Sequence, residues 1–424
     1  MERLKDRLGV IVNSGFLHVF GSSVINKFIA FLSNVVLVRI LSKPEFGVFT
    51  YAWNIYSILY LLSGMGIAFG ILQLTSEHSG DEEYAEKALN YGTRFGTFFD
   101  LSLVAVILFV GLFIPLKIEA SRPLLIALAA LPLLELFFEI MTAYLRGQKK
   151  HKEYSRLVVL NTSVLFISSA VCAFFFRSFG LVIGYYAAYL ISFLFGTFIL
   201  RIRLIRSKLP VFDDKRAILK ISVTSMLNNA STILMYLLDV FVLGIVIPQE
   251  SLLASYKVAT LIPTALTFIP ITLFAFFYPY FAEKKEDREW CLKRFKQILF
   301  WFGAFNIVLS AVLIIFAPWV ISLLYGAQYL DQITAFRILT VNYFFSATFR
   351  YVAVNILITQ RKLKYIFVLS IIITVLNVVA DYFFIQCWGT IGAAAATLSV
   401  DTLAGILCAV YLVYILKKPN SVSA

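Results

Sequence analysis

The chain has 424 residues, of which 60% are hydrophobic and only 14% are charged, and its mean hydropathy is +0.86. Soluble domains are about 45–50% apolar and about 25% charged, so a soluble fold of this length could not bury so much apolar surface. The formal net charge of +13 would suggest nucleic-acid binding in a soluble protein. In a membrane protein the distribution of that charge along the chain sets the topology instead.

Cysteine and histidine usage indicates neither a metal site nor a disulfide framework. The four Cys and three His residues are scattered, and no CxxC spacing occurs. We expect no cofactor and no catalytic residues. The N-terminal segment carries Arg3, Lys5 and Arg7, and the apolar stretch after it is long and lacks an A-x-A cleavage signal. It is therefore interpreted as a retained first span and not as a cleaved signal peptide.

Long apolar segments recur along the whole chain. A spanning helix needs about 20 mostly apolar residues. On this criterion the sequence predicts an all-α integral membrane protein with about twelve transmembrane helices. They lie near residues 16–38, 46–75, 95–114, 123–145, 157–176, 181–200, 221–247, 251–281, 297–316, 333–358, 365–385 and 390–416.

The Lys and Arg residues orient these spans. With the N-terminus inside, 28 of the 37 basic residues fall in inner segments, five fall in outer loops, and the rest lie within spans. Cytoplasmic loops carry an excess of Lys and Arg, so this bias predicts that both termini are cytoplasmic. Binding of anionic lipid headgroups is a second interpretation of the basic segments.

The chain repeats itself at offsets of 205 to 212 residues. Glu45 and Tyr51 in KPEFGVFTYAW recur as Glu250 and Tyr256 in PQESLLASYKV. LRGQKK at 145–150 matches LITQRK at 357–362, and FGLVIGYYAAYLIS at 179–192 matches WGTIGAAAATLSVD at 388–401. The three matches occur in the same order, which predicts a duplication.

The repeat predicts two six-helix lobes joined by a charged segment. The expected boundaries are 1–206 for the N-terminal lobe, 207–215 for a cytoplasmic linker and 216–424 for the C-terminal lobe. Because six is even, both halves begin on the inner side and the repeat is parallel. Its pseudo-twofold axis then lies along the membrane normal, and substrate is expected in a central cavity between the lobes.

Three of these segments also carry a family resemblance. VRILSKPEFGVFTYAW after the first span resembles the R-x-L-x-x-x-E-[FY]-G-x-[FY] signature of polysaccharide flippases. LLYGAQYLDQITAFRIL at 323–339 is similar to their segment before the tenth span, and GTIGAAAAT at 389–397 to the opening of their last span. The resemblance covers essentially the whole chain. It indicates the multidrug/oligosaccharidyl-lipid/polysaccharide exporter superfamily, and within it the O-antigen (Wzx-type) branch.

The resemblance implies a function in polysaccharide biosynthesis. Such a flippase moves an undecaprenyl-diphosphate-linked oligosaccharide from the cytoplasmic to the outer leaflet of the bacterial inner membrane by alternating access. The implied partners are this lipid-linked oligosaccharide, membrane lipids and a coupling ion, H⁺ or Na⁺, with no nucleic acid. The murein-precursor flippases of the superfamily usually carry two further spans, so their substrate is less favoured.

Charged residues within spans are the candidate site residues. Each costs about +2.5 to +3.5 kcal/mol near a helix centre and therefore needs a partner or a watery cavity. Asp239 and Lys257 are expected at similar depth, as are Arg337 and Asp381. Both pairs fit either structural ion pairs or a substrate-binding role.

Lys27 and Arg350 are the candidate cavity cations. Lys27 lies at the middle of the first span in a polar stripe with Ser23, Asn26 and Asn34, and a structural pair with Glu135 is the alternative. Arg350 lies deep in the tenth span with no acid at an obvious matching depth, and extension to the cytoplasmic interface is its alternative. Arg and Lys form charge-assisted bonds with phosphate oxygens, as a diphosphate carrier would require.

Two other functions remain as alternatives. A cation-coupled small-molecule exporter of the same superfamily would favour an acid-lined site in the first lobe. A membrane glycan polymerase or ligase would need a sizeable outer loop with catalytic polar residues. The longest outer loop, near 317–332, contains no His, Lys or Arg, and the chain has no phosphate-binding P-loop. We therefore expect a transporter and not an enzyme.

Overall fold

The computed structural model describes residues 16–205 and 212–417. All regular secondary structure in these two ranges is helical, which confirms the all-α membrane fold. The chain divides into two compact units, Met1–Ala230 and Ser231–Ala424. The basic residues of the N-terminus and positions 207–211 of the expected linker lie outside the described residues.

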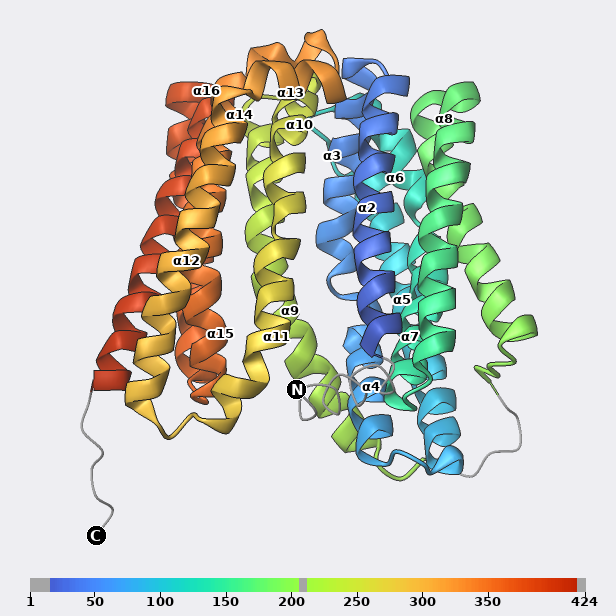
Figure 1. Cartoon of the computed structure of the whole chain (residues 1–424). Coiled ribbons are helices and arrows are strands. Elements are labelled where there is room, and N and C mark those ends of the chain that lie inside the picture. The colour runs from blue at the N-terminus through green and yellow to red at the C-terminus, as the bar shows by residue number, and fades with distance from the viewer. Residues whose placement is uncertain (1–15, 206–211, 418–424) are drawn as a thin grey trace. The chain divides into compact units, whose positions relative to one another are not determined.

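The first unit is a bundle of helices that run side by side (Figure 1). Short η turns connect or bend several of them. Its elements are α2 (Phe16–Ile40), α3 (Lys43–Tyr60), η1 (Ser63–Gly66), α4 (Ile67–Glu77), α5 (Glu82–Phe113), η2 (Glu119–Ser121), α6 (Arg122–Leu128), α7 (Leu131–Gly147), α8 (His151–Leu194), η3 (Phe195–Ile199) and the first part of α9 (Lys215–Val246).

The second unit is a similar bundle, shown from green to red in Figure 1. It begins within α9. The elements that follow are α10 (Glu250–Leu266), α11 (Phe268–Glu283), α12 (Arg288–Ile315), α13 (Ala317–Leu324), η4 (Ala327–Gln332), α14 (Ile333–Phe345), η5 (Ser346–Tyr351), α15 (Val352–Thr359) and α16 (Leu363–Lys417).

Length and composition identify seven helices of the described chain that can cross a membrane, or up to nine if each bent pair counts as one span. Two of the seven are far longer than the roughly 20 residues that one crossing needs. They are α8 and α16, and each reverses direction within its length, at Arg177 and at Gly389 respectively. Each of these helices therefore supplies two spans.

Hydrogen bonds across the two arms show that α8 and α16 are hairpins. Asn161 donates to the Ser192 hydroxyl at 3.1 Å in α8, and Tyr365 donates to the Leu407 carbonyl at 3.1 Å in α16. The turn of α16 uses Gly389 at φ 58°, which glycine adopts without strain. With the arms counted separately and α9 included, the described helices match the twelve predicted spans.

The start of α3 explains the sequence motif that contains Glu45. Its carboxylate accepts hydrogen bonds from both the backbone N–H and the hydroxyl of Ser42, each at 2.8 Å. This capping-box arrangement satisfies donors that a helix start would otherwise leave unpaired. Arg177 and Ser178, at the turn of α8, also donate to the carbonyls of Ile40 and Glu45. The α8 turn is thereby tied to the α2–α3 connection.

A bend of 43° separates α3 from α4. Gly64, Met65 and Gly66 all have positive φ there. The buried carboxylate of Asp100 on α5 holds the bend, because it accepts hydrogen bonds from the Gly64 N–H at 2.6 Å and the Ser63 hydroxyl at 2.8 Å. Asp100 therefore has a structural role in the first unit.

Candidate functional site

The two arms of α16 carry the polar residues of the second unit. Asn377 and Asp381 lie one helical turn apart on the first arm, and Thr397 and Asp401 lie one turn apart on the second. The arms approach closely at Gly392, where a Cβ atom would lie 1.9 Å from the Phe384 carbonyl oxygen. A side chain at position 392 would therefore force the arms apart.

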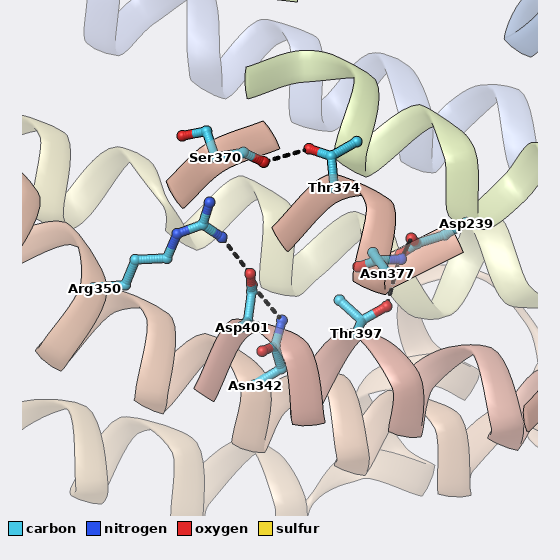
Figure 2. A network of polar contacts seen from close by, with 8 residues as sticks. All are labelled: Asp239, Asn342, Arg350, Ser370, Thr374, Asn377, Thr397 and Asp401. Atoms are coloured by element: carbon cyan, nitrogen blue, oxygen red, sulfur yellow. Dashed lines mark hydrogen bonds and ion pairs between the residues drawn. The ribbon is translucent and has the colours of Figure 1, made fainter. Parts of the chain in front are cut away.

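One group of these residues surrounds Asp239 of α9 (Figure 2). Its carboxylate accepts hydrogen bonds from the Asn377 amide at 2.8 Å and the Thr397 hydroxyl at 2.7 Å. The same Asn377 amide donates to Asp381 at 2.6 Å. Asp381 and Asn377 are buried, yet Asp381 Oδ1 and Asn377 Oδ1 have no hydrogen-bond partner among the described residues. We call Asp239, Asn377, Asp381 and Thr397 the Asp239 cluster.

A second group joins η5, α14 and the second arm of α16 (Figure 2). Arg350 forms an ion pair with Asp401, whose side chain is only 1% exposed. Asn342 also donates to Asp401, at 3.3 Å. The expectation that Arg350 has no acidic partner is therefore wrong, because Asp401 reaches it from the second arm of the hairpin.

A cavity of about 230 Å³ lies beside these two groups within the second unit. Lys257 of α10 lines it, together with Thr260, Asn342, Ser346 and Tyr351 among others. Asp239 and Asp401 also line it. No described carboxylate lies within ion-pair distance of the Lys257 ammonium group. The expected Asp239–Lys257 ion pair is therefore not formed, although both residues face the same cavity.

The expected pair of Arg337 and Asp381 is also contradicted. Arg337 is exposed, and its Nε donates to the carbonyl of Ile314 at 3.1 Å, at the end of α12. Asp381 is fully buried in the Asp239 cluster. The two side chains therefore contact different neighbours.

The polar stripe of the first span lies on α2, which packs against α8. Lys27 is exposed and forms no ion pair with any residue in the described ranges, so the Lys27–Glu135 pair is absent. Asn26 is half-buried, and its buried Oδ1 has no hydrogen-bond partner among those residues. Asn34 donates to the Ala30 carbonyl at 2.9 Å within its own helix.

Glu135 lies in a different group, formed by three helices of the first unit. It is 4% exposed, whereas Glu139, one turn further along α7, is exposed to solvent or lipid. Tyrosines of α3 and α8 surround the two carboxylates and interact with them electrostatically. We call this group the Glu–Tyr cluster; its members are Glu135, Glu139, Tyr56, Tyr60, Tyr185 and Tyr189.

Sequence reasoning missed Asn377 and Thr397, and it did not find Asp401 as the partner of Arg350. A signal was available in the spacing. Asn377 and Asp381, like Thr397 and Asp401, are four residues apart, which places each pair on one helix face. Two such polar pairs within one predicted hairpin indicate a shared site.

Comparison with known proteins agrees with this architecture. The model of a family described as polysaccharide biosynthesis protein matches residues 36–334. A comparison with curated protein sequences finds no match.

Solved structures with the same fold are transporters of the MOP superfamily. An inward-facing multidrug resistance MATE family transporter has a TM-score of 0.75 at 15% identity, with 94% of this chain and 96% of that chain covered. The lipid II flippase MurJ, in an inward closed conformation, has a TM-score of 0.71 at 17% identity, with 95% and 87% covered. A MOP superfamily transporter from Pyrococcus furiosus has a TM-score of 0.62 at 15% identity, with 95% of each chain covered.

Proposed function

The chain belongs to the polysaccharide biosynthesis protein family, and from this premise we propose that it is a flippase for a lipid-linked oligosaccharide. The substrate is an oligosaccharide on undecaprenyl diphosphate, as in the O-antigen branch of such flippases. It moves from the cytoplasmic to the outer leaflet of the bacterial inner membrane by alternating access. Both termini lie in the cytoplasm.

The observation that carries this proposal is the lysine in the cavity of the second unit. Lys257 lies on an apolar helix, where a charge without a counter-ion is unfavourable by several kcal/mol. Its ammonium group has no carboxylate partner in the described part of the chain, since Asp239 and Asp401 are engaged by Asn377, Thr397 and Arg350. The oxygens of a diphosphate would supply charge-assisted hydrogen bonds to it.

The size of the cavity fits a headgroup. Pockets for drug-sized ligands have volumes of about 300–1,000 Å³. A cavity of about 230 Å³ is smaller, so it suits a diphosphate and not several linked sugars. The amide of Asn342 and the hydroxyl of Tyr351 would provide further donors to phosphate oxygens.

The test uses undecaprenyl diphosphate and purified protein. Lys257→Gln should weaken binding of this lipid at least about tenfold, because hydrogen bonds to charged groups contribute about 1.5–3 kcal/mol. Lys257→Arg should retain most of the affinity, and it should also sustain export of surface glycan. Lys364→Gln, at an exposed position outside the cavity, is the matched control. Unchanged lipid binding by Lys257→Gln at normal abundance would refute this role.

The Asp239 cluster is where we place the coupling ion. Two buried carboxyl groups share one amide donor there, and no described Lys or Arg forms an ion pair with either. The unpaired oxygens of Asp381 and Asn377 are hard ligands. The described residues contain no group of three or more His, Cys, Asp or Glu that could hold a metal ion, so a monovalent ion, Na⁺ or H⁺, fits better than a divalent one.

Ion-specific stabilisation tests this placement. Exchange of K⁺ for Na⁺ at constant ionic strength should raise the unfolding temperature of the purified protein if Na⁺ binds. Asp381→Asn should abolish that increase. An increase that depends on pH and not on Na⁺ would identify the proton instead. If neither ion has an effect that Asp381→Asn removes, the coupling site lies elsewhere.

The exporter alternative draws on one observation, the two carboxylates of the Glu–Tyr cluster in the first unit. Carboxylates beside aromatic rings can bind organic cations. Lys257 would disfavour such a ligand in the second unit. Tight binding of an organic cation, with no binding of undecaprenyl diphosphate, would favour this alternative.

A further inference from the structure

Three helices of the first unit bring aromatic rings and carboxylates together. Trp53, Tyr56 and Tyr60 recur on one face of α3, at steps of three and four residues. The Trp53 ring stacks on Tyr185 of α8, with ring centroids 4.1 Å apart. Tyr56 stacks on Tyr60 with centroids 5.7 Å apart. Glu135 and Glu139 project from α7, which packs against α8.

A buried hydroxyl of this cluster, that of Tyr56, lacks a well-oriented hydrogen-bond partner within the described residues. The Tyr56 side chain is 1% exposed and its hydroxyl interacts with Glu135, but the geometry of that contact falls short of a well-formed hydrogen bond. Neither Glu135 nor Glu139 forms an ion pair with a Lys or Arg of the described ranges. Buried polar groups are nearly always hydrogen-bonded, so an external partner is expected here.

The chemistry of the cluster selects among the parts of the proposed substrate. Two carboxylates would repel a diphosphate, so the charged part of the lipid does not belong here. A sugar ring offers hydroxyl donors for the carboxylates and an apolar C–H face for an aromatic ring. The partly exposed rings of Tyr60 and Tyr189 provide such faces.

We propose that the Glu–Tyr cluster binds sugar residues of the transported glycan. This inference rests on the proposed flippase function and divides recognition between two sites. Lys257 in the second unit contacts the diphosphate, and the Glu–Tyr cluster in the first unit contacts the sugars. Substrate selectivity for the glycan is then set in the first unit.

An organic cation is the rival ligand, because aromatic rings and carboxylates also attract ammonium groups. Cation sites of this kind surround the ligand with free ring faces. Here the stacking of Trp53 on Tyr185 and of Tyr56 on Tyr60 occupies several of those faces. A sugar needs only one free face on one side of the ring, so the arrangement favours a sugar.

Binding to purified full-length protein tests the division. The first probe is the lipid-linked glycan extracted from cells in which the gene has been deleted. The second probe is undecaprenyl diphosphate without sugar. Wild-type protein should bind the glycan-bearing lipid at least about tenfold more tightly, because hydrogen bonds from sugar hydroxyls to a carboxylate are charge-assisted.

Variants should separate the two sites. Glu139→Gln and Tyr60→Ala should bring the ratio of the two affinities close to one and leave the affinity for sugar-free lipid unchanged. Lys257→Gln should weaken both lipids and preserve the ratio. Tyr60→Phe keeps the ring and should retain most of the preference, which guards against a folding artefact. Glu289→Gln, an exposed carboxylate on α12, is the matched control.

Two outcomes would overturn the inference alone. One is an unchanged affinity ratio in both Glu139→Gln and Tyr60→Ala. The other is the absence of any glycan preference in the wild type, together with tetraphenylphosphonium binding that Glu139→Gln abolishes. If wild-type protein binds neither lipid, the proposed function itself fails.

Discussion

Removal of the Arg350 guanidinium should destabilise the second unit. In Arg350→Met the Asp401 carboxylate, 1% exposed, would keep only the Asn342 hydrogen bond at 3.3 Å. Removing one partner of a buried ion pair costs about 3–5 kcal/mol, because the remaining charge stays buried without compensation. The Arg350 side chain is itself 16% exposed, so the lower end of that range is the better expectation.

The assay is thermal unfolding of the purified protein, followed by tryptophan fluorescence. For a domain the size of the second unit, 1 kcal/mol corresponds to about 2–4 °C in the unfolding midpoint. Arg350→Met should therefore lower the midpoint by at least about 6 °C. The double variant Arg350→Met/Asp401→Leu removes both charges and should recover most of the loss.

The alternative role for Arg350 gives a different result. If Arg350 binds substrate and the ion pair contributes little, Arg350→Met should keep the wild-type midpoint and lose glycan export. That result would refute the structural interpretation. A double variant no more stable than Arg350→Met would also refute it, because the buried carboxylate would then not be the cause of the loss.

Three further predictions follow from the helix connections. Gly392→Ala should sharply lower membrane abundance on immunoblots, because the added Cβ would lie 1.9 Å from the Phe384 carbonyl oxygen. The control Gly21→Ala, whose Cβ would meet no atom within 4 Å, should keep normal abundance. Equal abundance of the two variants would contradict the close packing of the α16 arms. Glu45→Ala should lower the free energy of unfolding by about 1 kcal/mol, because the capping box of α3 is lost. The unfolding midpoint measures this change. An unchanged midpoint would show that the capping box does not stabilise the protein. In a Cys-free variant, a single Cys at position 328 should react with an impermeant reagent in intact cells, and a single Cys at position 285 should not. Labelling of both positions would contradict the topology with both termini in the cytoplasm.

The sequence predicted the helices well because each span is a local property. Twenty apolar residues must form a helix in lipid, since every backbone polar group has to be satisfied internally. The motif around Glu45 was recognised as a family signature, but its structural role, the cap of α3, follows only from the hydrogen bonds of Ser42. The boundaries predicted for the two halves remain a prediction.

The partners of the buried charges could not be predicted by depth alone. At about 1.5 Å per residue, Arg350 was expected about 25 Å from the outer end of its span and Asp401 about 16 Å from the outer end of its own. The two side chains nevertheless form an ion pair, so depth along the helix was a poor guide to their contact. Asp239 and Lys257, which were expected at similar depth, line one cavity, but the direction of each side chain around its helix decided which hydrogen bonds form.

The hydrogen bond from Arg177 to Ile40 has a consequence for how the chain is made. Arg177 and Ile40 are 137 positions apart in the sequence. The α2–α3 connection is therefore synthesised long before the arginine that donates a hydrogen bond to it. At about 5–20 residues per second, the ribosome needs roughly 7–27 s to reach Arg177 after Ile40. During that interval the nascent connection at the membrane surface depends on its own contacts, of which the Ser42–Glu45 capping box is the local one. Loss of Glu45 should therefore impair biogenesis as well as lower the stability of the finished protein.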